Sequence, residues 1–516
     1  MRRILKRIIV ILPLVALEVA LIWLLLTWLH PWATQVAWLL RLLGVAFVLF
    51  IVSYRQEGAY RVLWLVFFSA APAVATVAYL MWGNKRTVRP ISRRMEEARK
   101  RLSVEDRLRI EERQELQRMG GNALLGIEEG AGAGRVSQSL RYVTNLSGYP
   151  AEVCEGARYY PLGRPCWQAM LGEMRRARHF IYLEYFIIED GLMWGEMCEV
   201  MRRKVEEGVD VRLIYDDLGS LPTFSSRDTA RLDEMGVKWI AFNKVAFISG
   251  TLNNRSHRKM LIVDGRVAFS GGINLADEYI GEVVKSGHWK DIGFRICGPA
   301  VGNYLHMFAQ FWNAFSEDQI PERFFELVPR VAREQDGIVL SYYDSPGNRD
   351  PVSNNFYVEM LGNAREYAWF YTPYLMLGDT LMDAFVRAAR RGVDVRIIMP
   401  GIPDKAVVFR LSRSFYRPLL DAGVKIYQYD PGFVHAKASL YDDEVCTLGT
   451  VNLDYRSLYL HFENNSIFWR SSVLTDLKRD YLETLERCTQ VQADDLREGL
   501  LGTLLDGVLR IFAPLC

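Results

Sequence analysis

The 516-residue chain lacks the cysteine and charge patterns that mark several common protein classes. Its seven cysteines are odd in number, form no C-x-x-C pair and lie in no tight cluster with histidine. This usage argues against a disulfide framework and a zinc site, and it suits reduced thiols. The net charge is only +2, without the strongly basic balance of a nucleic-acid binder. The sequence therefore predicts no metal, no cofactor and no nucleic-acid partner.

Long apolar runs are present, and they dominate the first 84 residues. Segments 8–29, 36–53 and 62–82 come close to or exceed the about 20 residues that a transmembrane helix needs. Arg41 interrupts the middle segment near its start, where arginine can snorkel to the interface, and tryptophans and tyrosines crowd the segment ends. Residues 1–84 are predicted to be a multi-pass transmembrane anchor. A cleaved signal peptide over 8–29 is the alternative.

Basic residues flank this anchor at both ends, and the positive-inside rule places each cluster in the cytoplasm. Three spans cannot satisfy both clusters, whereas two can. We expect the remainder of the chain to be cytoplasmic, and the number of spans stays open. The two clusters are Arg2, Arg3, Lys6 and Arg7, and Lys85, Arg86, Arg89, Arg93 and Arg94.

The remainder of the chain repeats itself. Residues 177–185 and 364–374 each read as a strand followed by a helical pattern, and Gly208 and Gly392 open similar second strands. The period of 184 residues is too long for a solenoid and indicates a duplicated domain. We predict an α/β fold with largely parallel sheets flanked by helices. Its parts are a charged juxtamembrane linker (85–149), two related domains (150–325 and 326–475) and C-terminal helices (476–516).

One motif, His-x-Lys-x4-Asp with a later asparagine, occurs once in each copy. The spacing from histidine to aspartate is 7 and from histidine to asparagine 17 in both copies. Residues two apart in an extended strand point the same way, so each histidine and its lysine can face one site. The two sets are His257, Lys259, Asp264 and Asn274, and His435, Lys437, Asp442 and Asn452.

Pairing the copies about a pseudo-twofold axis would bring two imidazoles and two ammonium groups together, which suits in-line substitution at a phosphodiester. One neutral imidazole attacks phosphorus, and one imidazolium protonates the leaving alkoxide. The lysines and the amides of Asn274 and Asn452 would stabilise charge on the non-bridging oxygens. Asp264 and Asp442 precede turns, so within the catalytic set we expect them to hold the strand ends.

These motifs resemble the phospholipase D superfamily pattern, H-x-K-x4-D followed by G-x-x-N. Further segments are similar to bacterial cardiolipin synthases. Two positions depart from that resemblance, since Lys290 replaces the arginine of W-R-D and His461 replaces the asparagine of L-N-F-E. The similar segments include 289–291, 371–374, 423–433, 449–457 and 461–463.

The resemblance implies a duplicated phospholipase D-type domain with pseudo-twofold symmetry, preceded by transmembrane helices. It also implies transfer of a phosphatidyl group from one phosphatidylglycerol to another, with release of glycerol and without metal. The intermediate would be a phosphohistidine, with His257 as nucleophile and His435 as general acid and then base. The alternatives are a membrane-bound phospholipase D, transfer to another lipid acceptor, a nuclease, and a membrane scaffold with an inactive site.

Several other features have structural interpretations. Two interpretations of Glu184 stay open: it lines the site, or it is a half-buried polar residue of a strand. Asp216 and Asp217 are predicted to lie in a solvated turn. Gly271 and Gly449 are expected to permit close backbone approach. A helix over 496–512 is expected to pack on the domain in preference to the bilayer. His179, His288, His306 and His461 are scattered along the sequence and form no cluster.

Overall fold

The computed structural model describes residues 20, 23, 32–53, 57–79, 83, 88–102, 133–244, 253–496 and 499–515. The predicted span 8–29 lies outside these residues except at Ala20 and Trp23. The span predicted at 36–53 lies within helix α2 (Ala33–Ser53). Across these described ranges, no helix combines the length and the apolar character that a bilayer crossing requires.

The span predicted at 62–82 is divided between two helices, α3 (Gly58–Ala70) and α4 (Pro72–Ala78). Ala71 between them has φ −149° and ψ 76°, which no α-helix accommodates. Pro72 lacks a backbone N–H and therefore begins a new helix. The expectation of one continuous helix over this segment was wrong.

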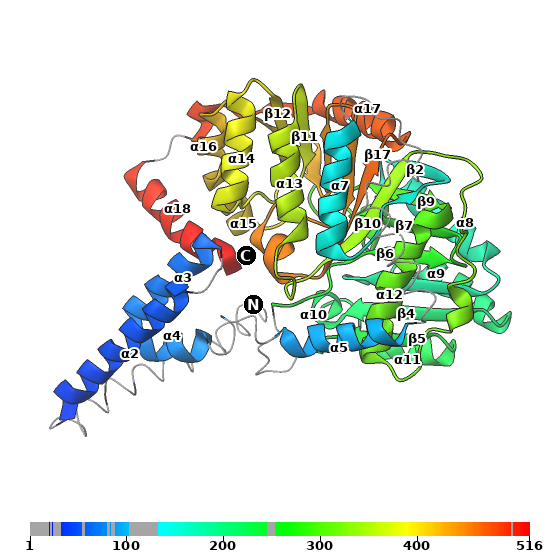
Figure 1. The fold of residues 1–516 in the computed structure, drawn as a ribbon, viewed down its shortest axis with the longest axis horizontal. Coiled ribbons are helices and arrows are strands. Elements are labelled where there is room, and N and C mark those ends of the chain that lie inside the picture. Colours follow the sequence, from blue (N-terminus) through cyan, green and yellow to red (C-terminus); the bar gives the residue numbers. More distant parts are fainter. Residues whose placement is uncertain are drawn as a thin grey trace.

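Two large sheets flanked by helices lie in the rest of the molecule (Figure 1). These two sheets have the same strand order. The first sheet runs β2-β9-β7-β6-β3-β4-β5, and the matching part of the second runs β10-β17-β16-β15-β11-β12-β13. Strands β1 and β18 extend the second sheet at its two edges. The predicted duplication is confirmed at the level of topology.

The strands of the first sheet are β2 (Gly156–Tyr160), β3 (Phe180–Tyr185), β4 (Asp210–Asp216), β5 (Lys238–Phe242), β6 (Met260–Val263), β7 (Val267–Gly271) and β9 (Gly293–Cys297). Those of the second are β1 (Glu152–Val153), β10 (Ile338–Asp344), β11 (Tyr367–Tyr371), β12 (Asp394–Pro400), β13 (Lys425–Tyr429), β15 (Ala438–Tyr441), β16 (Val445–Gly449), β17 (Glu463–Trp469) and β18 (Cys488–Gln490).

The sheets are mixed, which corrects the prediction of largely parallel pairing. Among the strands described, parallel neighbours in the two large sheets are confined to β3–β4–β5 and β11–β12–β13. Helices connect these strands, as parallel neighbours require. The motif strands β6 and β15 instead form hairpins with β7 and β16, so they pair antiparallel. The sequence pattern predicted the helical connections between the parallel strands, but it did not predict the hairpins β6–β7 and β15–β16 that follow them.

Helices flank both sheets and show the same arrangement in each copy. In the first copy α9 follows β3, and in the second α14 follows β11. The flanking helices are α8 (Gly163–Arg176), α9 (Leu192–Glu206), α10 (Asp217–Ser220), α11 (Ser226–Glu234), α12 (Val301–Phe315), α13 (Val352–Asn363), α14 (Asp379–Arg390), α15 (Ala406–Ser414), α16 (Tyr416–Leu420) and α17 (Val473–Leu485).

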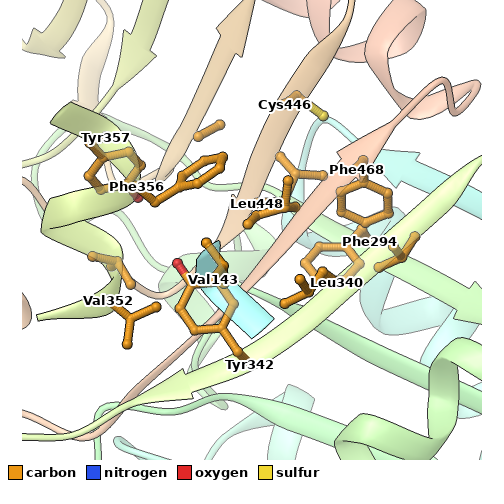
Figure 2. Packing of buried hydrophobic residues seen from close by; sticks show 14 of the residues in the cluster. Val143, Phe294, Leu340, Tyr342, Val352, Phe356, Tyr357, Cys446, Leu448 and Phe468 are labelled. Carbon is orange, nitrogen blue, oxygen red and sulfur yellow. The ribbon is translucent and has the colours of Figure 1, made fainter. Parts of the chain in front are cut away.

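One hydrophobic core passes from one domain into the other. In Figure 2, Phe294 of β9 lies against Phe468 of β17, with ring centroids 5.3 Å apart. Leu340 of β10 and Leu448 of β16 extend the same cluster, and Val352 of α13 lies in it on the second domain's side. Burial of this continuous apolar surface fixes the two copies relative to each other.

The predicted linker 85–149 contributes two helices to this core. Ile91 and Met95 of α5 (Arg89–Arg101) are buried in it, as are Leu140 and Val143 of α7 (Ala133–Ser147). The described parts of this segment are therefore packed structure, and no detached linker is formed by them. At the other end, β18 belongs to the second sheet, so that domain continues beyond residue 475.

Candidate active site

The two motif segments approach each other because each is hydrogen-bonded to the other copy. The His257 backbone N–H donates to the Phe462 carbonyl oxygen at 2.8 Å, and the His435 N–H donates to the Lys290 carbonyl at 2.7 Å. A short parallel pair of β8 (His288–Lys290) with β14 (Gly432–Val434) leads into the second contact. The pseudo-twofold arrangement predicted from the sequence therefore brings both motifs to one place.

A carboxylate from the opposite copy orients each histidine. His257 Nδ1 lies 2.9 Å from both carboxylate oxygens of Glu463, and His435 Nδ1 lies 2.6 Å from Asp291 Oδ2. Both carboxylates are fully buried. A proton on Nδ1 that is donated to the carboxylate leaves Nε2 as the nitrogen available for chemistry. We call these two contacts the crossed histidine–carboxylate pairs.

Burial and cationic neighbours lower the pKa of both imidazoles. Burial lowers the pKa of His257 well below its ordinary value, and the charges of Lys259, Lys437 and His435 lower it further. The pKa of His435 is also lowered, first by burial and then by Lys437. The first motif therefore feels charges from the second, as expected for one shared site.

Asp291 gives the second half of the site a proton near neutral pH. Burial raises the pKa of its carboxyl group to about 7. Because Asp291 is hydrogen-bonded to His435, carboxyl and imidazole together hold one titratable proton up to that range. An imidazolium with Nδ1 held by a carboxylate is suited to donate from Nε2.

The two motif lysines fold back onto their own histidines. Lys259 Nζ donates to the His257 carbonyl oxygen at 2.7 Å, and Lys437 Nζ donates to the His435 carbonyl oxygen and lies 2.8 Å from Nδ1. Burial lowers the pKa of Lys259 to about 7 and that of Lys437 to about 8. An anionic phosphate placed between them would favour their charged forms.

Asp264 and Asp442 hold the start of the neighbouring strands. Asp264 accepts hydrogen bonds from the backbone N–H groups of Arg178, His179 and Phe180 at 2.8 to 2.9 Å. Asp442 accepts the equivalent three bonds at the start of β11. Both residues have φ near +50°, a region that aspartate tolerates in turns. Their carboxylates therefore support the hairpins that follow the motifs.

The two motif asparagines are buried and differ in their partners. Asn274 accepts from the Ile187 N–H at 3.1 Å and donates to the Tyr279 hydroxyl at 2.7 Å. Asn452 donates to Asp454 at 3.0 Å. Among the described residues, its Oδ1 has no hydrogen-bond partner. Each of these bonds uses one of the two hydrogens on the amide nitrogen, and substrate binding by these residues remains a prediction.

Close backbone contacts surround the site where glycine was expected to allow them. A side chain on Gly271 would meet the Ile292 carbonyl oxygen at 2.3 Å, and one on Gly449 would meet the Asn464 carbonyl at 2.5 Å. Gly271 also has φ +142°. Larger residues would therefore push β9 or β17 away, together with the carboxylates that orient the histidines.

Comparisons with known proteins agree with this geometry. A family described as "Cardiolipin synthase, PLD-like domain" matches residues 170–285 and 357–485, one segment in each copy. A protein of Alkalihalophilus pseudofirmus named cardiolipin synthase is 32% identical over 92% of each chain. The chain belongs to this family.

Two further relatives extend the comparison. The cardiolipin synthase 2 of Bacillus anthracis is 34% identical to this chain, over 68% of this chain and 69% of its own. The crystal structure of a phosphatidylserine synthase from Haemophilus influenzae superposes with a TM-score of 0.55 at 15% identity, covering 73% of this chain and 98% of its own. At that identity the second likeness concerns the fold.

The carboxylates that orient the histidines, Asp291 and Glu463, were not among the site residues predicted from the sequence, and neither was His461. Asp291 and Glu463 lie in segments that resemble cardiolipin synthases, and this was the available signal. His461, interpreted as scattered, lies beside His257 with ring centroids 5.7 Å apart. In the described part of the chain, neither of its ring nitrogens has a hydrogen-bond partner, and Glu463 lies 3.7 Å from Nδ1.

The spacing of His257, His461 and Glu463 brings one possible ligand atom from each within 4.8 Å of the others. Glu463 is already engaged, since it accepts hydrogen bonds from His257 and from the Thr450 hydroxyl. Burial lowers the pKa of His461 to about 4, so this imidazole is neutral at working pH. We therefore assign the contact between His257 and Glu463 to hydrogen bonding.

Glu184 and Asp216 bind the residues next to His257 in the first motif. Glu184 binds Arg258 at 2.7 Å and accepts from the Ser256 hydroxyl at 2.6 Å, so its carboxylate is fully used within the protein. Asp216 is completely buried and accepts from Arg255 and from the Ser256 N–H. The expectation of a solvated turn at Asp216 was wrong, because Arg255 compensates its buried charge.

Proposed function

We propose that this protein is a cardiolipin synthase, transferring a phosphatidyl group from one phosphatidylglycerol to a hydroxyl group of another. The observation that carries the proposal is the crossed histidine–carboxylate pairs, which hold two imidazoles at one site through their Nδ1 atoms. Family membership supports the lipid substrate. The two buried lysines beside the histidines support binding of a phosphodiester anion.

In the first step, His257 Nε2 forms a bond to phosphorus as the bond from phosphorus to the headgroup glycerol oxygen breaks. The hydrogen bond from Nδ1 to Glu463 leaves the lone pair on Nε2. His435 Nε2 gives its proton to the leaving oxygen, so glycerol departs as the neutral alcohol. The phosphatidyl group then stays on His257 as a phosphohistidine.

In the second step, a glycerol hydroxyl of another phosphatidylglycerol gives its proton to His435 and attacks phosphorus. The bond from phosphorus to His257 breaks, and its electron pair returns to the imidazole. Lys259 and Lys437 neutralise the charge on the non-bridging oxygens in both steps. The balance is two phosphatidylglycerols consumed, and one cardiolipin and one glycerol formed.

The rival reaction at the same site is hydrolysis, in which water takes the place of the second lipid. Purified protein given only phosphatidylglycerol in detergent, with no added metal, should yield cardiolipin and free glycerol. Phosphatidic acid as the main product would replace the synthase by a phospholipase D. Absence of turnover on phosphatidylglycerol and on other phospholipids would favour a scaffold.

We also propose that residues 1–84 attach the enzyme to the cell membrane with the catalytic domains in the cytoplasm. The apolar segments 8–29, 36–53 and 62–82 support attachment, and the basic residues that follow support the orientation. Arg93 on α5 is exposed and offers a test position. A membrane-impermeant maleimide should label an Arg93→Cys variant only after the cells are opened. Labelling in intact cells would reverse the orientation.

A further inference from the structure

Helix α18 (Leu500–Phe512) is amphipathic, and it turns its polar side toward the protein. Asp506 accepts a hydrogen bond from Arg410 Nε at 2.9 Å, and Arg510 Nε donates to the Ser414 hydroxyl at 3.2 Å. Arg410 and Ser414 both lie on α15. Helices of globular domains normally do the opposite and bury their apolar face.

The apolar side of α18 faces outward. No residue of the helix is buried, and Leu501 is 84% exposed. A run of large apolar residues at helical spacing is rarely left exposed on one face, because water contact with such a surface is unfavourable. The exposed residues are Leu500, Leu501, Leu504, Leu505, Val508 and Phe512. The helix contacts the domain through α15, as the sequence analysis expected, but these apolar residues stay uncovered.

The exposed face of α18 continues onto the N-terminal helices. The Phe512 ring lies 6.0 Å from that of Phe67 on α3, and Figure 1 shows α18 beside α3, with α2 extending from the same side of the molecule. α2 and α3 expose further large apolar side chains, including Leu42, Leu49 and Val62. The apolar surface of α18 is therefore contiguous with the segments whose composition predicts membrane contact.

We propose that α18 is an in-plane membrane anchor, which lies in the headgroup region of a phospholipid bilayer with its leucine face toward the acyl chains. Its 13 residues are too few to cross a bilayer, which needs about 20. Its charged side chains are held against α15, so the outward face enters lipid without carrying Asp506 or Arg510 with it.

This anchor fixes the active site relative to the bilayer. Leu509 packs in a small cluster with Leu411, Phe415 and Tyr455, and Tyr455 lies three residues after Asn452 of the second motif. Arg456 donates to the Leu515 carbonyl oxygen. A helix seated in the bilayer and packed on this segment would hold the site near the headgroup level. Lipid contact by α18 does not depend on which reaction the site performs.

Lipid contact can be measured with a fluorescent label on the full-length protein. A Leu504→Cys variant would carry an environment-sensitive dye in nanodiscs of phosphatidylcholine with phosphatidylglycerol. Leu482→Cys provides the matched control, since Leu482 is a partly exposed leucine on α17, another surface helix. Both variants would carry Cys516→Ser. Lipids with a quencher on the acyl chain should quench the dye at 504 roughly fivefold more than at 482. Equal quenching at the two positions would overturn the proposal.

A second copy of the chain is the competing occupant of this face. A pyrene label at Leu504→Cys would then give excimer emission together with weak lipid quenching, which would also overturn the proposal. A third arm uses Leu501→Glu with Leu504→Glu, against Leu482→Glu. The double variant should lose roughly tenfold in activity on bilayer phosphatidylglycerol and little on a short-chain soluble analogue. Equal loss on both substrates would contradict an anchoring role.

Discussion

The two halves of the active site share one backbone plan and differ in the side chains around each histidine. In both halves a backbone N–H of the motif histidine binds a carbonyl of the other copy, one residue before the orienting carboxylate. His435 is enclosed by Tyr279, Trp289 and Phe433, whose rings lie 5.4 to 6.0 Å from it.

In the other half, the rings beside His257 are those of Phe186 and His461. His461 and Trp289 each stand two residues before the orienting carboxylate, and each ring lies 5.7 Å from its histidine. Duplication therefore supplied equal geometry, and later divergence supplied unequal chemistry. Asp291, with its pKa raised to about 7, keeps the proton on the His435 half. This asymmetry supports His257 as nucleophile and His435 as acid.

The largest effect is expected from removing either histidine. His257→Ala and His435→Ala should each lower kcat by at least about a thousandfold, because one loses the covalent step and the other the proton transfer. Initial rates of cardiolipin formation measure this loss. His179→Ala, at an exposed position, is the control and should leave the rate unchanged. Substantial activity in either site variant would refute the two-histidine mechanism.

Removing the orienting carboxylates should cost less. Glu463→Gln and Asp291→Asn are each expected to lower kcat by about a hundredfold, because the amide no longer fixes the Nδ1–H tautomer. The two variants should differ in pH response, since only Asp291→Asn removes the proton reservoir of the His435 half. Identical pH profiles for both variants would show that the halves are interchangeable.

The rate should fall at alkaline pH. A lysine with a lowered pKa is charged below that value and loses its charge as pH rises through it. For Lys259 this value is about 7 and for Lys437 about 8, and the Asp291–His435 pair loses its proton near 7. We expect kcat/KM to fall by roughly tenfold or more between about pH 7 and pH 9. A profile that stays flat to pH 9, with the fold intact by thermal unfolding, would contradict this electrostatic account.

The smallest effect concerns His461. His461→Asn restores the asparagine of the L-N-F-E motif found in similar proteins. Asparagine keeps one hydrogen-bond donor and one acceptor, so KM should change by less than about threefold. His461→Ala removes both and should raise KM by about tenfold with a smaller change in kcat. Because the His461 imidazole is neutral above about pH 4, the Asn variant should keep the wild-type pH profile. A shifted profile would assign His461 a proton-transfer role.

Much of this site was accessible from the sequence because the repeat is exact in spacing. Equal intervals from histidine to aspartate and asparagine predicted two copies of one motif in a duplicated domain. In the fold each copy leads into a hairpin, β6–β7 or β15–β16, which the sequence analysis did not predict. The strand-end position of Asp264 followed from the turn after it. Topology beyond the repeat did not follow, since antiparallel pairing of β6 with β3 depends on tertiary packing.

The orienting carboxylates could not be derived from spacing. Glu463 lies 206 residues from His257 in the chain, and no local pattern relates them. The sequence also could not predict what covers the C-terminal helix, because an apolar helical face has the same residue pattern whether protein or lipid covers it. The hydrogen bonds of Asp506 and Arg510 to α15 are the structural observation that supports our proposal of lipid contact.

The central claim is the division of labour between His257 and His435, and the covalent adduct tests it most directly. The protein would be mixed with phosphatidylglycerol, quenched within one turnover in alkaline denaturant, which preserves phosphohistidine, and digested for mass spectrometry. The account predicts a phosphatidyl adduct on the peptide that carries His257. An adduct on His435, or the absence of any adduct during active turnover, would contradict it.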